Sequence, residues 1–208
     1  MPKPSSALRI LSWNVLRKVG AGPDDVAALI VRYRPDLVLL QEADLTMARL
    51  PELVGGNFAR DEFPGRIHGP AIWSPAPMGR PRLVRLRGGA TRRHAQVVDR
   101  GPFTIVNVHL AHGQLTCRRQ LREAASAISG AGAVIGDFNM IGPAVLPGFS
   151  DVGPREPTHI AQDMLPVRID RCLVRGMACL SARALSAGRS DHRPMLLELA
   201  AADIALAA

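Results

Sequence analysis

Two short stretches of the sequence place acidic, amide and imidazole side chains close together directly after apolar residues. AVIGDFNM ends an apolar run at a glycine and continues with Asp137 and Asn139. SDHRPM puts Asp191 beside His192 shortly before the C-terminus. Carboxylates bind hard cations and accept protons, and an imidazole changes its charge near neutral pH. These residue types therefore indicate acid–base or metal-assisted chemistry.

Four more polar residues stand at or within the ends of apolar runs. They are Asn14 after LRILSW, Glu42 after DLVLLQ, His109 after FTIVNV and Asp170 after VRI. Each one alone is typical of a turn residue, a solvated carboxylate or a hydrogen-bonded core histidine. Side chains at strand ends converge on one edge of a sheet, where loops build sites on a rigid support. The repeated pattern favours one common site.

In their order, these motifs resemble those of the endonuclease/exonuclease/phosphatase superfamily, which has the deoxyribonuclease I-like fold. The matching motifs are SWN, LLQE, VNVHL, GDFN, RID and SDHRP, and they extend from residue 12 to residue 194. GDFN and SDH are the specific motifs, whereas SWN or QE alone would be weak. The resemblance implies a divalent-metal-dependent phosphoesterase whose residues surround a scissile phosphate.

The resemblance also implies a Mg²⁺ site, in which Mn²⁺ is a possible substitute. The implied metal ligands and neighbours are Glu42, Asn14 and Asp191. Carboxylate and amide oxygens suit a hard cation, and the sequence has no Cys/His cluster typical of structural zinc. Several family members carry a second acidic or amide residue shortly after the first Asn, where this chain has Val15 and Leu16. A one-metal site is therefore predicted.

The catalytic residues implied by the resemblance are His109, Asp137, Asn139, Asp170 and His192. Asp137 would orient or deprotonate the attacking water, and Asn139 would donate its amide to that water or to the phosphate. An extended segment would point these two side chains to the same side and Phe138 to the packed side. Asp170 would fix the tautomer of His192 and favour its imidazolium, which binds an anionic phosphate. His109 would touch the phosphate or the leaving group.

Four other histidines match no motif. They are His68, His94, His112 and His159, and they are predicted to be surface or turn residues, with a place at the border of the site as the alternative for His112 and His159.

Short apolar runs alternate with turn residues along the chain, which predicts many strands and few helices. The predicted strands are 8–15, 36–42, 71–74, 82–87, 94–99, 103–110, 133–136, 168–174, 179–185 and 194–200. Helices are predicted over 24–33, ending before Pro35, and over 115–129, with Leu115 on the apolar face. The pattern favours an α+β fold with two mixed β-sheets packed face to face and helices outside, a four-layer α/β/β/α sandwich.

Residues 1–208 are predicted to form a single domain, because no internal repeat or linker interrupts the pattern. The last eight residues are predicted to be a loose tail or a short helix. No apolar run is long enough for a signal peptide or a membrane span, and three scattered cysteines indicate reduced thiols. A cytoplasmic monomer is therefore expected, with no protein partner implied.

The chain carries a net charge of +8, which favours polyanionic partners such as nucleic acid or phosphorylated lipid. An arginine-rich stretch contributes to this charge, with Arg80, Arg82, Arg85, Arg87, Arg92 and Arg93. The stretch is either a solvated face or a track for backbone phosphates. In the second case, the substrate-binding residues are Arg85, Arg87, Arg92 and Arg93.

Charge and arginines together favour a nuclease that hydrolyses nucleic-acid phosphodiester bonds. The alternative is a phosphomonoesterase acting on inositol, sugar or lipid phosphates, for which Arg171 and Arg193 are a weak signal. Abasic-site endonucleases of the superfamily carry an aromatic residue where this chain has Val167, and apolar loops like those of sphingomyelinases were not found. A non-catalytic binding module is disfavoured because every catalytic motif position is filled.

Overall fold

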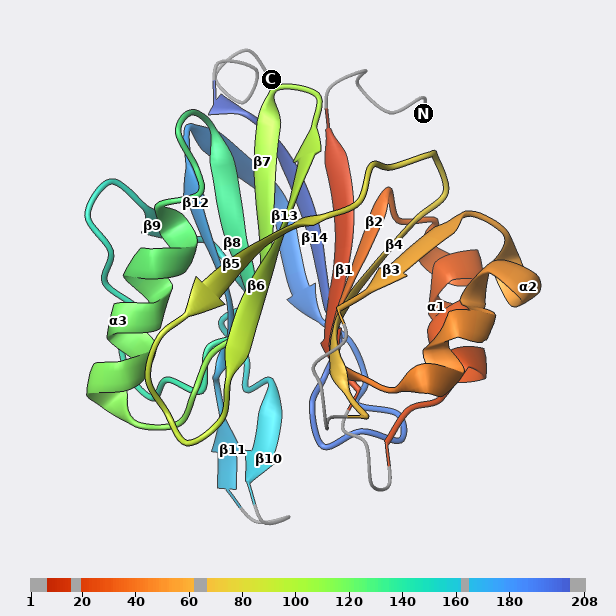
Figure 1. Cartoon of the computed structure of the whole chain (residues 1–208), viewed down its shortest axis with the longest axis horizontal. Coiled ribbons are helices and arrows are strands. Elements are labelled where there is room, and N and C mark those ends of the chain that lie inside the picture. The colour runs from red at the N-terminus through yellow and green to blue at the C-terminus, as the bar shows by residue number, and fades with distance from the viewer. Residues whose placement is uncertain (1–6, 16–19, 62–66, 162–164, 203–208) are drawn as a thin grey trace.

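The computed structural model describes residues 7–15, 20–61, 67–161 and 165–202. Within these residues, two six-stranded β-sheets lie against each other, and helices cover their outer faces (Figure 1). Helices α1 (Pro23–Tyr33) and α2 (Leu50–Val54), with the 3₁₀ helix η1 (Leu45–Arg49), lie on one side, and α3 (Gln114–Ala125) lies on the other. The predicted α/β/β/α sandwich is confirmed.

The first sheet, sheet A, has the strand order β13–β14–β1–β2–β4–β3. Its strands are β1 (Leu8–Asn14), β2 (Leu37–Ala43), β3 (Asn57–Arg60), β4 (Gly69–Ser74), β13 (Met177–Ala184) and β14 (Met195–Ala201). Strands β1 and β2 are parallel and are joined through α1, whereas the other neighbours pair antiparallel. Helix α1 ends at Tyr33, with Arg34 in the left-handed conformation directly before Pro35. The predicted stop at Pro35 is confirmed.

The second sheet, sheet B, has the order β5–β6–β7–β8–β12–β9. Its strands are β5 (Arg82–Leu86), β6 (Arg93–Arg100), β7 (Phe103–His109), β8 (Gly132–Asp137), β9 (Ser150–Asp151) and β12 (Asp170–Arg175). Strands β7 and β8 are the parallel pair, and α3 connects them. A separate hairpin of β10 (His159–Ala161) and β11 (Leu165–Val167) projects from the lower end of the molecule (Figure 1).

The two sheets are held together by an apolar layer between them. It includes Ile10 and Leu39 of sheet A and Ile105 and Ile135 of sheet B, all fully buried. Burial of such side chains supplies about 1.5–3 kcal/mol each, which keeps the strand ends of both sheets in a fixed relation. The rigid edge formed in this way supports the polar residues described below.

Helix α3 differs from the prediction in its length and in the exposure of one residue that was expected to be buried. It ends at Ala125, and Leu115 is 87% exposed, although Leu121 is buried against sheet B. The two leucines are six positions apart, which is not a whole number of turns at about 3.6 residues per turn. The assignment of Leu115 to the apolar face was wrong for this reason.

The ten predicted strands are present, with ends that agree within two residues. Short elements were missed, namely η1, α2, β3, β9, β10 and β11. Residues 203–208 of the predicted tail and Leu16 lie outside the described residues. In the described part of the chain, no helix has the length and apolar character needed to cross a membrane.

Candidate active site

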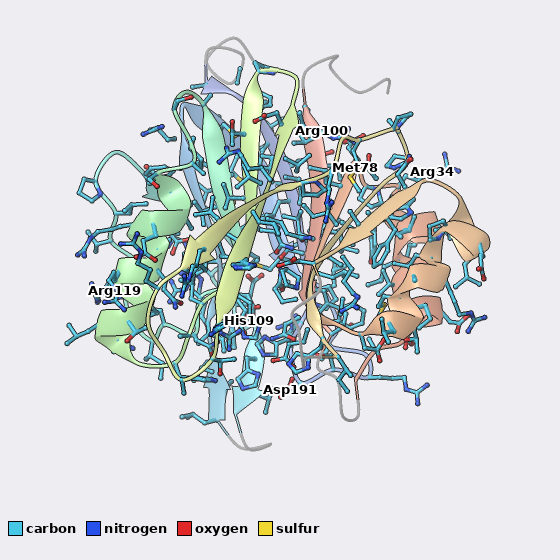
Figure 2. All side chains as sticks on the ribbon, in the orientation of Figure 1. Arg34, Met78, Arg100, His109, Arg119 and Asp191 are labelled. Carbon is cyan, nitrogen blue, oxygen red and sulfur yellow. The ribbon has the colours of Figure 1, made fainter. Side chains whose placement is uncertain are left out.

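The carboxyl ends of both parallel strand pairs meet at one edge of the sandwich. Strands β12 and β14 run the other way and therefore begin at this edge. The side chains gathered here are Asn14, Glu42, His109, Asp137, Asp170 and His192. Figure 2 shows His109 and Asp191 near this edge, at the lower end of the molecule. The structure thus brings together the residues that the sequence motifs singled out.

Three of these residues form a row across sheet B. His109 is the register partner of Asp137 in the parallel pair β7–β8, and Asp170 is its partner in the antiparallel pair β8–β12. The row places two carboxylates and one imidazole on neighbouring strands about 4.8 Å apart. Strand pairing alone therefore fixes their spacing.

Asp137 is the centre of the cluster and is 1% exposed. Its Oδ2 accepts a hydrogen bond from Asn14 Nδ2 at 3.0 Å, and this bond joins sheet A to sheet B. His109 Nε2 lies 3.3 Å from the same oxygen, and His192 Nε2 lies 3.9 Å away. Its Oδ1 accepts the backbone N–H of Asn139 at 2.8 Å. A carboxylate held by several donors is fixed in orientation.

Asn139 reaches Asp137 in a way that the sequence did not predict. Its φ angle is +48°, so the chain turns into the left-handed conformation and is not extended there. Asparagine tolerates this conformation better than most residues. The amide Nδ2 consequently donates to the Leu110 carbonyl at 2.9 Å and lies 3.5 Å from Asp137 Oδ2. The extended-segment prediction was wrong, but the burial of Phe138 is as expected.

Gly136 is the glycine that ends the apolar run of AVIGDFNM. Its φ angle is +138°, and a Cβ at this position would overlap the carbonyl oxygen of Val108 on the neighbouring strand. Only glycine allows β8 to stay paired with β7 up to Asp137. The glycine therefore permits the close strand contact that sets Asp137 beside His109.

Glu42 reaches the site through an irregularity in β2. The pairing with β4 shifts register between Leu40 and Ala43, and Glu42 has a φ angle of +58°. Left-handed backbone in a residue other than glycine costs about 1–3 kcal/mol and often marks functional sites. The preceding Gln41 holds the bulge by donating a buried hydrogen bond to Asn107 Oδ1 at 2.8 Å. Glu42 Oε1 lies 3.9 Å from His109 Nδ1 as a result.

His192 is paired with Asp170 through a hydrogen bond of 2.9 Å at Nδ1. Burial lowers the pKa of His192, but the carboxylates of Asp170, Asp137 and Asp191 together outweigh it, and the pKa is raised to about 10. The backbone of His192 is also fixed. The indole N–H of Trp13 donates to the His192 carbonyl, and the backbone N–H of His192 donates to the Ser190 hydroxyl. The ring is therefore an imidazolium at neutral pH.

His109, unlike His192, is uncharged. Burial lowers the pKa of His109 to about 3, although the nearby Asp137 carboxylate opposes this shift. At neutral pH its ring is uncharged. The site thus holds one charged and one neutral imidazole on two sides of Asp137.

His159 lies beside the site, a place that the sequence offered only as the alternative to a surface or turn role. Its ring stacks on His192 with a centroid distance of 4.3 Å, and its Nδ1 lies 3.8 Å from Asp191 Oδ2. The prediction of a surface or turn role was wrong. The contact arises from an isolated bridge between His159 and His192, residues far apart in the sequence, so no local pattern announces it.

The donor atoms at this edge fit a divalent cation. Asp137, Asp170 and His192 present ligand atoms within 4.8 Å of one another, and Asp191 with His159 and His192 forms a second such group. Asp191 Oδ1 is buried and has no hydrogen-bond partner among the described residues. Its ion-pair partner is His192 Nε2, which lies 3.9 Å away and makes no hydrogen bond to it.

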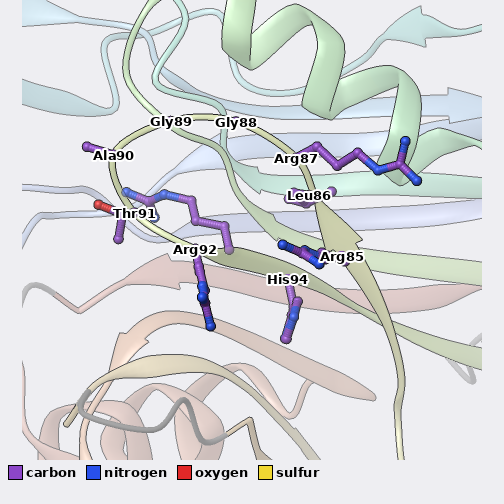
Figure 3. A pocket seen from close by; sticks show the side chains of 10 residues that line it. Arg85, Leu86, Arg87, Gly88, Gly89, Ala90, Thr91, Arg92 and His94 are labelled. Atoms are coloured by element: carbon purple, nitrogen blue, oxygen red, sulfur yellow. The ribbon is translucent and has the colours of Figure 1, made fainter.

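The arginine-rich stretch lines a groove of 760 Å³ formed by the β5–β6 hairpin, which includes Arg85, Arg87, Arg92 and Arg93. Figure 3 shows Arg92 and His94 projecting from the same side of the hairpin. A smaller pocket of 140 Å³ is lined by Arg92, Arg93 and His94 and also by Glu42 and His109. The basic groove therefore adjoins the carboxylate cluster.

Arg171 and Arg193, the weak signal for a phosphomonoesterase, are used within the fold. Arg171 is 5% exposed and donates to Asp151 at 3.0 Å and to the Gly142 carbonyl at 2.8 Å. Arg193 donates to the Leu185 carbonyl at 2.7 Å and to two further carbonyls. Their guanidinium groups hold loops together and do not extend into the carboxylate cluster.

A sandwich of two mixed sheets with this polar cluster at its strand ends is the architecture of deoxyribonuclease I-like phosphoesterases. Residues 11–192 match the model of the endonuclease/exonuclease/phosphatase family. The chain belongs to this family, whose members are hydrolytic phosphoesterases that generally use a divalent metal. No curated protein sequence matches the chain.

Solved structures share the fold. A functionally unknown conserved protein from Enterococcus faecalis V583 has a TM-score of 0.78 at 19% identity, covering 93% of this chain and 100% of that one. An endonuclease/exonuclease/phosphatase from Bacteroides vulgatus has a TM-score of 0.74 at 18% identity, with 94% and 99% covered. Truncated TDP2 from Caenorhabditis elegans has a TM-score of 0.70 at 17% identity, with 94% and 98% covered. At these identities the likeness concerns the fold.

Proposed function

We propose that the protein is a divalent-metal-dependent phosphodiesterase that cleaves nucleic-acid strands. The observation that carries this proposal is the continuity between the basic groove and the carboxylate cluster. Arg92, Arg93 and His94 line both the groove and the small pocket at Glu42 and His109. A strand whose backbone phosphates lie on the arginines of the hairpin would lead one phosphate toward Asp137.

The residues of the cluster have complementary roles in this proposal. Asp137, a buried carboxylate held by fixed donors, orients the attacking water and takes its proton. The His192 imidazolium, held by Asp170, stabilises the charge that develops on the phosphoryl oxygens. Neutral His109 and the Asn139 amide lie beside Asp137 and would hydrogen-bond the phosphate or the water.

Glu42, Asn14 and Asp191 are the proposed residues that hold the cation, with Mg²⁺ as the expected ion and Mn²⁺ as a substitute. When bound, such a cation neutralises charge on the phosphate and supports the leaving oxygen. The strained backbone at Glu42 supports its assignment, because it turns an acidic side chain toward His109. The assignment of Asp191 is supported by its Oδ1, which has no hydrogen-bond partner among the described residues.

The first test is a parallel screen of plasmid DNA, oligonucleotides, RNA and inositol phosphates, each with Mg²⁺, Mn²⁺ or excess chelator. We expect cleavage of nucleic acid with metal and no cleavage with chelator. Glu42→Gln should reproduce the effect of the chelator while the thermal unfolding midpoint stays close to that of the unaltered protein. Hydrolysis of inositol phosphates alone would replace the nuclease proposal by the phosphomonoesterase alternative, and full activity in chelator would contradict the mechanism.

The second test concerns the groove. Replacing Arg85 and Arg87 together with Gln should weaken binding of an oligonucleotide and reduce the slope of log K against log salt. The expected reduction is about one unit for each phosphate contact removed. A matched control replaces Arg32 and Arg49, which are also exposed but lie among the helices on the outer side of sheet A. If both pairs change the salt slope equally, the groove has no special part in binding.

A further inference from the structure

A cluster of three donor residues lies beside the proposed catalytic carboxylates. It consists of His159, Asp191 and His192. His159 Nδ1 lies 3.8 Å from Asp191 Oδ2, and His192 Nε2 lies 3.9 Å from Asp191 Oδ1. One ligand atom from each residue falls within 4.8 Å of the other two. Three donors that converge in this way are able to share one small cation.

Backbone pairing fixes this cluster before any ligand arrives. His159 and His192 form a β-bridge, and the N–H of Ile160 donates to the Asp191 carbonyl at 3.1 Å. The N–H of Arg193 donates to the Thr158 carbonyl at 2.7 Å. Stacking of the two imidazole rings restricts their rotation further. The donors are therefore held by two chain segments whose relative position is set by hydrogen bonds.

Two polar atoms of the cluster make no hydrogen bond to any described residue. His159 Nδ1 and Asp191 Oδ1 are both buried, and neither has a hydrogen-bond partner within residues 7–15, 20–61, 67–161 and 165–202. Buried polar atoms are hydrogen-bonded in the great majority of cases, so two atoms without a hydrogen bond in one cluster call for an explanation. A cation between them would supply the missing partner to both.

The donor set selects the kind of cation. Two imidazole nitrogens and one carboxylate oxygen suit Zn²⁺ and similar transition metals, whereas Mg²⁺ prefers oxygen ligands throughout. Tetrahedral Zn²⁺ with bonds of about 2.0–2.1 Å places its ligand atoms about 3.3 Å apart, so the ligand atoms, which now lie within 4.8 Å of one another, must move closer when the ion binds. Asp170 accepts from Nδ1 of His192, the carboxylate–histidine support that zinc ligands commonly have.

We propose that His159, Asp191 and His192 form an inhibitory site for Zn²⁺ or a similar transition metal, which shares Asp191 with the Mg²⁺ site proposed at Glu42 and Asn14 and differs from it by its two nitrogen ligands. Coordination at Nε2 of His192 releases the Nε2 proton to solvent and occupies the nitrogen whose N–H the imidazolium would donate to phosphate. A metal-bound His192 and a phosphate-bound His192 exclude each other. Binding at this site is independent of the proposed phosphodiesterase activity, but the inhibition rests on it.

The experiment measures binding directly and then activity. The full-length protein, freed of metals and returned to saturating Mg²⁺, is titrated with Zn²⁺ by calorimetry, and with Co²⁺ while its visible absorption is recorded. We expect one ion per chain, with Co²⁺ absorption typical of nitrogen and oxygen ligands. His159→Phe keeps an aromatic ring against His192 but lacks Nδ1, and it should weaken binding by about 100-fold or more. His112→Phe is the matched control at an exposed histidine outside the cluster and should bind as the unaltered protein does.

In the presence of Mg²⁺, Zn²⁺ should inhibit cleavage by the unaltered protein and by His112→Phe at concentrations that leave His159→Phe active. Equal Zn²⁺ affinity in the unaltered protein and His159→Phe would overturn the site. Loss of Zn²⁺ binding in Glu42→Gln but not in His159→Phe would also overturn it, because the ion would then occupy the Mg²⁺ site. If no phosphate ester is cleaved at all, the proposed function fails, while the two titrations still decide whether the metal site exists.

Discussion

Replacement of Asp137 with Asn should reduce kcat by about 10²–10⁴-fold, the range expected when a positioned general base is lost. Asp137 Oδ2 faces Asn14 Nδ2 and His109 Nε2, and its Oδ1 faces the backbone N–H of Asn139. An amide at this position turns its NH₂ either toward Asn14 or toward Asn139, so one donor always meets another donor. The variant therefore loses the charge and also one hydrogen bond, which should lower stability by about 1–3 kcal/mol.

A second variant separates the two effects. Combining Asn14→Asp with Asp137→Asn exchanges donor and acceptor across the 3.0 Å contact, and so restores a hydrogen bond between the sheets. We expect this double variant to regain much of the lost stability in thermal unfolding. It should stay inactive, because the carboxylate is then carried by residue 14 of β1 and no longer by residue 137 of β8. Recovery of kcat with recovery of stability would show that Asp137 acts only as a structural link. Nearly full activity in Asp137→Asn would remove it from the chemistry altogether.

The positions of the site residues could be predicted because they follow apolar runs. The runs before Asn14, His109 and Asp137 became buried parallel strands, and the carboxyl ends of parallel strands lie at one edge. Pairing between β7 and β8 then sets His109 opposite Asp137 without any further information. Roles for these residues, by contrast, came from the resemblance to a family and not from the pattern.

Contacts that depend on single backbone irregularities were not accessible from the sequence. The left-handed turn at Asn139 and the bulge before Glu42 each redirect one side chain, and neither disturbs the apolar pattern of its strand. The meeting of His159 with His192 depends on a three-residue strand, too short for any periodicity to be visible. The prediction for helix α3 was wrong for another reason. Leu115 satisfies a loose spacing rule for an apolar helix face, but its side chain is exposed to solvent.

Replacing Asp170 with Asn should lower the pKa of His192 and reduce kcat by about 10²–10³-fold. Burial alone lowers the pKa of His192, and the Asp170 carboxylate is the main group that raises it to about 10. Without that charge, burial is opposed only by Asp137 and Asp191, so the pKa should fall. A ring that is neutral stabilises a phosphate in the transition state less well. The measurement is an NMR titration of the metal-free protein, with kcat determined on the most active substrate of the screen.

The same pairing predicts a pH dependence of stability. The folded protein holds the His192 proton more tightly than the unfolded chain does, where the pKa is about 6.5. The stabilisation from the pair is thus complete below about pH 6.5 and declines as the pH rises toward 10. Asp170→Asn should reduce this decline, because the pKa of His192 in the folded state moves closer to that in the unfolded state.

A double-mutant cycle on kcat/KM tests whether Asp170 acts through His192. Asp170 touches the ring at Nδ1, on the side away from Asp137, so its effect on a phosphate should pass through the imidazole. Asp170→Asn should then cost little once His192 is already Ala, because residues that act as a unit give losses that do not add. Fully additive losses, together with an unchanged pKa of His192 in Asp170→Asn, would show that the 2.9 Å contact carries no part of the chemistry.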